Sequence, residues 1–337
     1  MNGQTLETEL QSRAEQGDER ARDLWPRYDS MRAHLEEHYY PWVQANNPWF
    51  TDHGKRHVRS VVCAASRLLG THLTDRQQVT ALDLFLLLSG IIWHDAGMVL
   101  QRHDHAAEVP RVTEQIKALG FPDPSVHRMV DEISRAHSGD GGLRAARAEE
   151  RWRDHVVYPR ALAALVRLAD EVSDSRDRIS YDLIEQVPEE QRIYWEYANV
   201  VSASMPDPAR ERLVVAIELQ RNVATQRFRC GAESLKERTD AEGRMSLIEY
   251  VLCRLEKMNN ERAYCSPEFG RYCAIREVEA RFMICDGAER IENCELSITL
   301  GDAGLGGEGY PSIPVFVSFF EQHPDWHPDR LKEVLGL

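Results

Sequence analysis

The sequence predicts a mainly α protein, in which a helical bundle is followed by a smaller α+β module. Two observations support this fold class. In the first part of the chain, apolar residues recur at intervals of three and four, which is the spacing of the buried face of a helix. After Tyr181 the pattern changes, and the segments "RLVVAIELQ", "REVEARFMI" and "CELSITLGD" alternate or cluster as strands do.

The chain of 337 residues is longer than a single hydrophobic core usually needs, so we expect more than one structural part. The segment "HYYPWVQANNPWF" contains Pro41 and Pro48, which interrupt a helical N-terminal stretch. We therefore predict an N-terminal helical lead-in over residues 1–47, a helical domain over residues 48–185, and an α+β accessory domain over residues 186–337. A second copy of the chain or a protein partner could bind through the accessory domain.

Local signals place the first helices of the helical domain. A helix is expected from His57, with a buried face formed by Val58, Val61, Val62, Ala65, Leu68 and Leu69. Thr74 or Asp75 is expected to cap the next helix, because both side chains accept hydrogen bonds from free N–H groups. That helix runs through Leu82–Trp93.

The later elements follow from similar signals. A third helix carries the apolar positions of Val126–Ile133 and leads to His137. Pro159 suits the first turn of a fourth helix, which is expected to run through "ALAALVRLADEVSDS". In the accessory domain, "MSLIEYVLCRLEKMNNE" predicts an amphipathic helix and "HPDRLKEVLGL" a short terminal one. "SGDGG" and "GDAGLGGEG" are predicted loops, and the second lacks the pattern of a phosphate-binding loop.

Composition excludes several classes of protein. A hydrophobic content of 42% and a charged content of 28% are typical of a globular protein in water. The formal net charge of −14 repels polyanions, which argues against extended, non-specific binding of nucleic acid. A small basic pocket for one nucleotide remains compatible with this charge. The seven cysteines include no CxxC pair, so Cys265, Cys273, Cys285 and Cys294 are predicted to be buried apolar residues.

The sequence also predicts a cytoplasmic protein with reduced thiols and no membrane contact. Its N-terminus is polar and acidic, without the apolar segment of a signal peptide. No uninterrupted apolar run reaches the roughly 18 residues expected of a membrane span. The most apolar run, "LFLLLSGIIWHDAGM", is broken by Ser89 and Gly90 and ends in His94 and Asp95.

These last two residues pose a burial problem, because a dry and unpaired imidazole or carboxylate costs several kcal/mol. Metal-competent side chains end or interrupt apolar helices at four places, namely His57, the His94–Asp95 pair, His137 and Asp170. Imidazole and carboxylate together suit divalent first-row metals. Helical bundles build metal sites from such side chains on facing helices, and an open coordination position can activate a bound water.

The order of these residues resembles the HD superfamily of metal-dependent phosphohydrolases, over roughly residues 50 to 185. "HVRSV" looks like the first His segment of that superfamily, "IIWHDAGM" like its His-Asp doublet, and "LVRLADEVSD" like its last metal-binding Asp. The resemblance implies that His57, His94, Asp95 and Asp170 bind one or two divalent ions, which could be Mn, Fe, Co, Ni, Zn or Mg. It also implies hydrolysis of a phosphoester or phosphoanhydride bond.

A closer resemblance concerns the "DHGxxH" opening and the short segment from Arg102 to His105. Both are similar to a subgroup of HD proteins that occur alone or with ATPase domains, in bacterial conflict systems that include antiviral defence. Nucleotide triphosphohydrolases of the superfamily use extra histidines to protonate or orient the leaving oxygen. His105 is our first choice for this role and His137 the second, and we assign catalysis to these two and to Asp95. Either histidine could instead complete a second metal site.

Other polar side chains near the motifs are open to two interpretations. His53 and His103 could reach the site or belong to a solvated polar turn. Five basic residues surround the motifs in sequence, and some of them should bind phosphate oxygens. They are Lys55, Arg56, Arg102, Arg176 and Arg178. Arg176 and Arg178, the two arginines of "RDR", could instead form an exposed charge cluster.

The function that best fits these observations is a metal-dependent phosphohydrolase that acts on a nucleotide. A (deoxy)nucleoside triphosphate is the favoured substrate, because the acidic surface disfavours a long polyanion and extra histidines follow the doublet. One alternative is a phosphodiesterase or nuclease acting on cyclic nucleotides or single-stranded nucleic acid. Another is a regulatory protein that holds a nucleotide without turnover, although such a sensor has no need of a complete set of metal ligands.

Overall fold

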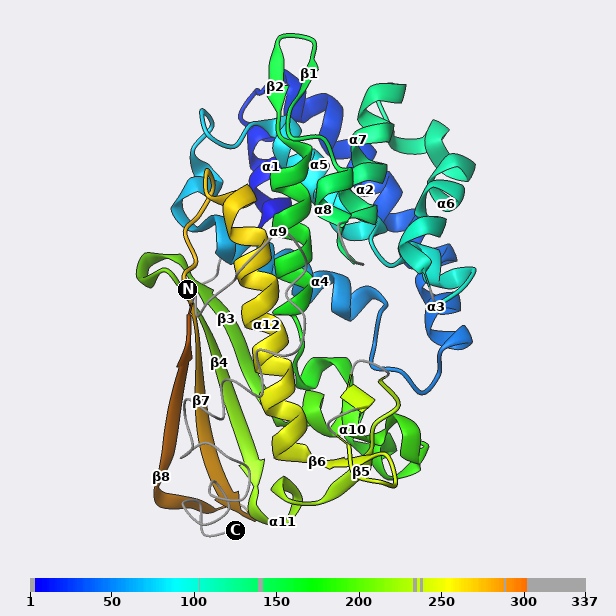
Figure 1. The fold of residues 1–337 in the computed structure, drawn as a ribbon. Helices are drawn as coiled ribbons and strands as arrows, with labels where there is room; N and C mark the ends of the chain where they lie inside the picture. The colour runs from blue at the N-terminus through cyan, green and yellow to red at the C-terminus, as the bar shows by residue number, and fades with distance from the viewer. Residues whose placement is uncertain are drawn as a thin grey trace.

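A computed structural model describes residues 4–102, 104–138, 142–232, 235–236, 239–287 and 289–301 (Figure 1). The protein is mainly α, with a helical bundle followed by a part that contains a small sheet, as the sequence predicts. The predicted loop "GDAGLGGEG", apart from its first residue, and the predicted terminal helix lie outside the described residues.

The helical part begins with α1 and continues to residue 200. Its helices are α1 (Leu6–Glu15), α2 (Glu19–His38), α3 (Tyr40–Asn46), α4 (Lys55–Leu69), α5 (Ala81–Trp93), α6 (His105–Gly120), α7 (Pro124–Arg135), α8 (Gly142–Ala145), α9 (Pro159–Glu171) and α10 (Glu189–Val200). Short 3₁₀ helices lie between or after them, at η1 (Gly70–Thr74), η2 (Ala96–Val99), η3 (Arg176–Arg178), η4 (Tyr181–Gln186) and η5 (Pro208–Arg210). The hairpin of β1 (Glu150–Trp152) and β2 (His155–Val157) projects at the top of Figure 1.

The helix α5 forms the centre of the bundle, and every one of its residues is buried. It packs against α1, α2, α4, α7 and α9. Gly90 permits the close approach of α7, because a Cβ atom there would lie 2.4 Å from Cγ2 of Ile133 on α7. By length and mean hydropathy, Ala81–Val99 would suffice to cross a membrane, a longer stretch than the sequence suggested. However, 94% of this window is buried inside the protein, as in the core helix of a bundle.

Two predicted helix ends are wrong. The helix α5 begins at Ala81 and not after Thr74 or Asp75, because Thr80 and Asp83 form a reciprocal capping box at its N-terminus. Asp75 instead accepts hydrogen bonds from two backbone N–H groups of a single turn that follows η1. The helix α9 ends at Glu171, earlier than predicted, and the residues after it form a turn.

The α+β part follows α10. Its elements are β3 (Val201–Asp207), β4 (Arg212–Gln220), α11 (Arg221–Ala224), β5 (Arg227–Arg229), β6 (Arg244–Ser246), α12 (Leu247–Phe269), β7 (Glu277–Asp286) and β8 (Glu289–Leu300). Four of the strands form a sheet in the order β3-β4-β7-β8, in which β4 and β7 are parallel and the two outer pairs antiparallel. The three predicted strands and the predicted amphipathic helix are confirmed as β4, β7, β8 and α12.

The helix α12 connects the sheet to the bundle, because it packs against β7 and runs beside α9 (Figure 1). Arg167 of α9 donates two hydrogen bonds to the carboxylate of Glu261 on α12, at 2.6 Å and 3.0 Å, and both side chains are buried. One continuous hydrophobic core extends from α5 to sheet residues such as Leu213 and Val278. The domain boundary near residue 185 stays a prediction, and the core is continuous across it.

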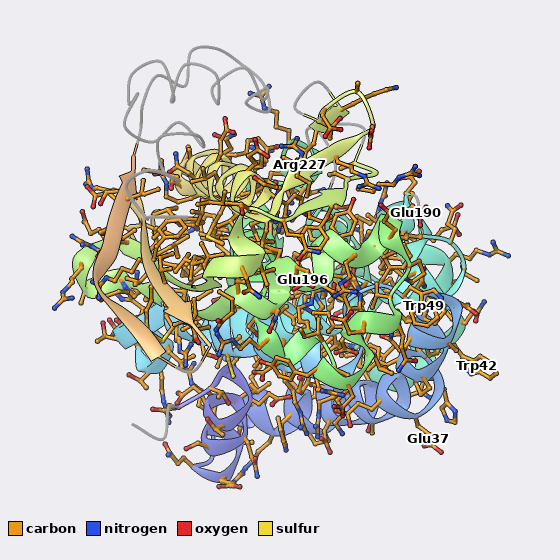
Figure 2. All side chains as sticks on the ribbon, turned by 90° about the horizontal axis from the view of Figure 1, so that it is seen from below. Glu37, Trp42, Trp49, Glu190, Glu196 and Arg227 are labelled. Carbon is orange, nitrogen blue, oxygen red and sulfur yellow. The ribbon has the colours of Figure 1, made fainter. Side chains whose placement is uncertain are left out.

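The surface carries a few isolated large apolar side chains. Trp42 on α3 is 61% exposed and points away from the ribbon (Figure 2). Among the cysteines whose side chains the structure describes, Cys63 on α4 is exposed and the others are buried. Burial of Cys265, Cys273 and Cys285 was predicted, whereas the side chain of Cys294 lies outside the description.

Candidate metal centre

Six imidazole and carboxylate groups from five parts of the bundle converge at one place. His57 lies in the first turn of α4, and the adjacent His94 and Asp95 follow the last residue of α5. The other three come from the first residue of α6, the turn after α7, and the end of α9, and they are His105, His137 and Asp170. All six lie within two groups whose ligand atoms are close enough to hold a metal ion.

The first group consists of His57, His94 and Asp170. The Nε2 atoms of the two histidines are 3.2 Å apart. Oδ1 of Asp170 lies 3.0 Å from Nε2 of His57 and 3.7 Å from Nε2 of His94. Both imidazoles are buried, so the bundle excludes bulk water from them. Two imidazoles and a carboxylate at this spacing are suitable for a first-row divalent ion.

The second group consists of Asp95, His105 and His137. Oδ1 of Asp95 lies 3.1 Å from Nε2 of His105 and 3.7 Å from Nε2 of His137. The two imidazole Nε2 atoms are 3.0 Å apart. His105 and His137 are therefore close enough to serve as ligands as well as acid–base groups.

Asp95 contacts both groups through different oxygens. Its Oδ1 faces the second group, whereas its Oδ2 lies 3.2 Å from Nε2 of His94 and 3.5 Å from Nε2 of His57. A carboxylate in this position can bridge two ions, and two-metal sites clamp both the attacking and the leaving oxygen of a phosphoryl group.

Hydrogen bonds at the far nitrogen orient all four imidazoles. Each Nδ1 atom faces an acceptor of the protein, which fixes a proton on Nδ1 and directs Nε2 toward the centre, where a neutral imidazole presents its lone pair. The acceptors are the carbonyl oxygens of Ile91 for His94 (2.6 Å), of Ser134 for His137 (2.5 Å) and of Arg102 for His105 (3.0 Å), and the hydroxyl of Ser173 for His57 (3.3 Å). This tautomer is the one that a metal ligand requires.

The electrostatics of the centre also favour a cation. Burial would raise the pKa of Asp95, but the charge of His94 and the hydrogen bonds from His105 and His94 together outweigh burial and hold that pKa well below its usual range. Burial lowers the pKa of His137 to about 3, assisted by His94. For His94 itself, burial would lower the pKa, but the charge and hydrogen bond of Asp95 and the charge of Asp170 together outweigh burial and raise the pKa to about 9. The carboxylate is thus ionised at neutral pH, and His94 carries a proton that an ion would displace.

Local sequence explains how the backbone reaches this arrangement. A Cβ atom at Gly97 would lie 2.0 Å from the carbonyl oxygen of His105, so glycine lets the start of α6 return to the doublet. At the start of α4, Asp52 accepts hydrogen bonds from the N–H groups of Gly54 (3.2 Å) and His57 (3.0 Å).

Arg178 links the segments that carry His57 and Asp170. Its guanidinium donates to the carbonyl oxygen of Asp52 at 2.9 Å and forms an ion pair with Asp174. The backbone N–H of Asp52 in turn donates to the carbonyl oxygen of Arg178 at 2.8 Å. Arg178 is therefore already engaged in holding the two segments together.

A cavity of about 700 Å³ opens beside the metal centre. Among the five basic residues predicted near the motifs, Arg102 and Arg178 line this cavity. The guanidinium of Arg102 lies 3.4 Å from the centroid of the Phe50 ring and makes no ion pair with any described residue. It is thus a cation held in place by an aromatic ring, with its charge available to a ligand.

The structure places the other three predicted basic residues outside this cavity. Lys55 forms an ion pair with Glu36 of α2. Arg176 pairs with Glu218 at 2.6 Å. Arg56 lies on the exposed face of α4.

Of the two other histidines that the sequence analysis considered for the site, His53 and His103, the structure describes only His53. His53 lines the cavity, and its ring centroid is 5.6 Å from that of His57. Burial, together with the charge of Arg178, lowers its pKa to about 3, so His53 is neutral at physiological pH. His103 lies outside the described residues.

Several cavity residues could not be found by motif reasoning. Arg254 of α12 pairs with Glu171 at 2.9 Å and with Asp174 at 2.8 Å, and Lys257 pairs with Glu171 at 2.6 Å. The helix α12 is distant from the motifs in sequence, and no pattern in it indicates a contact with α9. Ser173, whose hydroxyl faces His57, lies outside this lining but within the quoted "LVRLADEVSD" segment, so it could have been considered.

The shared carboxylate predicts how metal content responds to substitution. We expect Asp95→Ala to lose both ions, because it removes an oxygen from each group, and His105→Ala to lose the second ion and keep the first. Elemental analysis of the purified variants measures this, with His72→Ala, on η1, as the control. Full occupancy in Asp95→Ala would refute the ligand assignment, and two ions in His105→Ala would refute the second group alone.

The raised pKa of His94 predicts a proton release when metal binds. Below pH 9 the metal-free imidazole is protonated, and an ion can bind only the neutral form. Apparent affinity should therefore rise with pH up to about 9 and level off above it. Calorimetric titration in buffers of different ionisation enthalpy should show release of about one proton at pH 7. A heat that is independent of the buffer would contradict the assignment.

Comparison with known proteins agrees with the geometry. A family model described as HD-CE matches residues 38–231, which is more than half of the chain. No curated protein and no solved structure gives a significant match. The match continues past residue 185 and includes all six clustered side chains, so the resemblance to HD proteins is confirmed. Since it covers the complete cluster and most of the helical part, the chain belongs to the HD-CE family.

Proposed function

We propose that this HD-CE protein is a metal-dependent phosphohydrolase that cleaves a phosphoester or phosphoanhydride bond of a nucleotide. The observation that supports the proposal most directly is the pair of ligand groups that share Asp95. An HD-type domain with such a cluster indicates phosphohydrolase chemistry. The nucleotide is an inference from the cavity and its charges.

The roles of the residues follow from their positions. Bound ions would supply an activated water and polarise a phosphoryl oxygen. His57, His94 and Asp170 would hold one ion, His105 and His137 would hold the second, and Asp95 would contribute to both. If the first group alone is filled, His105 is free to donate a proton to the leaving oxygen, since it is the least buried of the four clustered histidines.

The nature of the ligands narrows the choice of ion. Four imidazoles and two carboxylates favour Mn, Fe, Co, Ni or Zn, because Mg prefers a shell of oxygen ligands. We propose manganese as the first ion to test.

We also propose a role in bacterial antiviral defence, which the resemblance of the "DHGxxH" segment supports.

A (deoxy)nucleoside triphosphate is the favoured substrate. A cavity of about 700 Å³ falls within the usual range for small-molecule sites. Arg102 offers an unpaired guanidinium near the centre, whereas Arg254 and Lys257 on the wall are paired with Glu171 and Asp174. Arg102, together with bound ions, would offset the charge of a triphosphate as the bond breaks.

A phosphodiesterase is the second candidate, and the second ligand group favours it. His105 and His137 lie as close to Asp95 as metal ligands require, so a two-ion centre could occupy both histidines. Cyclic nucleotides and short single strands are the corresponding substrates.

A hydrolysis screen with manganese separates the candidates. Triphosphate, nucleoside diphosphate and monophosphate products are resolved by chromatography after incubation with dNTPs, NTPs, cyclic nucleotides and single strands. Release of tripolyphosphate from a dNTP supports the first candidate, and turnover of diesters alone supports the second. Turnover of no substrate by a fully metal-loaded protein would refute the proposed enzyme.

Arg102 provides a prediction specific to the cavity. We expect Arg102→Gln to lower kcat/KM by about 10- to 100-fold, because it removes a charge-assisted hydrogen bond to phosphate. Metal content should stay unchanged, since Arg102 binds no ion. Steady-state kinetics measures the effect, with Arg111→Gln on the exposed side of α6 as the matched control. An unchanged kcat/KM would remove Arg102 from the substrate contacts.

A further inference from the structure

The outer face of α4 borders a second recess, on the opposite side of that helix from the metal centre. This groove has a volume of about 490 Å³ and lies between α4, the turn after α9, and the edge strand β3. Arg56, Arg59, Cys63 and Arg67 line it along one exposed stripe of α4. The stripe spans about 16 Å at the rise of an α-helix.

The three arginines of this stripe are unpaired. Their guanidinium groups make no ion pair or hydrogen bond with any described residue, although the chain carries a net charge of −14. The helix α4 contains no Asp or Glu among its fifteen residues. In α2, by contrast, basic residues pair with carboxylates three or four positions away, as Arg27 does with Asp23.

The other wall of the groove supplies hydroxyl groups and little negative charge. Ser175, Ser202 and Ser204 lie along it, and the buried Oγ of Ser204 has no hydrogen-bond partner among the described residues. Asp177 borders the groove without an ion pair to the described residues. Asp174 also borders it, but its carboxylate pairs with arginines of the metal cavity. Three guanidinium groups thus face one uncommitted carboxylate.

We propose that this groove is a second anion-binding site, which takes the phosphate groups of a nucleotide or of a short nucleic-acid strand. Arginine binds phosphate with two parallel hydrogen bonds, and hydroxyl groups can complete the contacts. Three guanidinium groups spread over about 16 Å suit several phosphates in a row better than one. The net acidity of the remaining surface restricts such binding to this stripe.

The groove lies one helix away from the first ligand group. The helix α4 carries His57 on its inner face and the arginine stripe on its outer face. Ser173 borders the groove, and its hydroxyl lies 3.3 Å from Nδ1 of His57. A ligand in the groove would therefore contact the helix and the turn that orient this imidazole. The binding itself does not depend on the proposed hydrolysis.

Chemical labelling of Cys63 reports directly on ligand binding in the groove, because Cys63 lines the groove and the other described cysteines are buried. The rate at which a maleimide labels Cys63 is measured by mass spectrometry of its peptide, in the metal-loaded full-length protein. Tripolyphosphate and an eight-residue oligothymidylate are the two probes. We expect at least one of them to slow labelling about tenfold at saturation, with an affinity that falls steeply as salt rises.

A pair of charge variants ties the protection to the stripe. Arg59→Gln/Arg67→Gln should weaken the apparent affinity by at least about tenfold, because two charge-assisted contacts are lost. Arg111→Gln/Arg151→Gln makes the same change in net charge at exposed positions elsewhere and should keep wild-type protection. Thermal unfolding should be alike for both, since exposed substitutions seldom alter stability by much.

The outcomes distinguish a free nucleotide from a nucleic-acid strand as the ligand, and they include results that would contradict the proposal. Protection by tripolyphosphate assigns the site to free nucleotides, and protection by the oligonucleotide alone assigns it to a strand. If neither probe protects Cys63, or if both double variants lose protection equally, the proposal is wrong. Neither result bears on the hydrolysis screen, because labelling requires no turnover.

Discussion

The structure of the site depends on one carboxylate held at the end of a fully buried helix. Asp95 is ionised in a place that apolar side chains would make prohibitively costly without compensation. Its two oxygens face two different sets of imidazoles, and these contacts offset part of the cost of burying the charge. The oxygen and nitrogen atoms that meet there form a site suited to a cation. The helices α4 and α6 begin, and α7 and α9 end, close to Asp95, and each of them, or the turn that follows it, contributes one imidazole or carboxylate to the cluster.

The residues that cluster as proposed metal ligands were largely predictable from sequence, because each follows from a local signal. His57, the His94–Asp95 pair and Asp170 interrupt apolar periodicities, and their order along the chain repeats a known pattern. The helix ends were less predictable. Thr80 and Asp75 are both good capping residues, and the reciprocal bond to Asp83 decided between them only in the folded chain.

The cavity wall was predictable only in part. Nearness in sequence to His57 did not bring Lys55 or Arg56 to the cavity, since a helix turns about 100° per residue and points its neighbours elsewhere. Arg254 did reach it, through a contact between α9 and α12 that joins segments about 80 residues apart. Such long-range packing depends on the tertiary fold, and a single sequence holds no local trace of it.

The contact between α9 and α12 has a consequence for how this protein can diverge. The segment shared with the HD-CE family ends at residue 231, whereas Arg254, Lys257 and Glu261 come after it and still line the cavity. The clustered imidazoles and carboxylates and part of the cavity wall are thus encoded in separate stretches of the gene. Mutations confined to α12 can change the charge and shape of the cavity while every clustered imidazole and carboxylate stays untouched, so the cavity wall and the cluster can diverge at different rates.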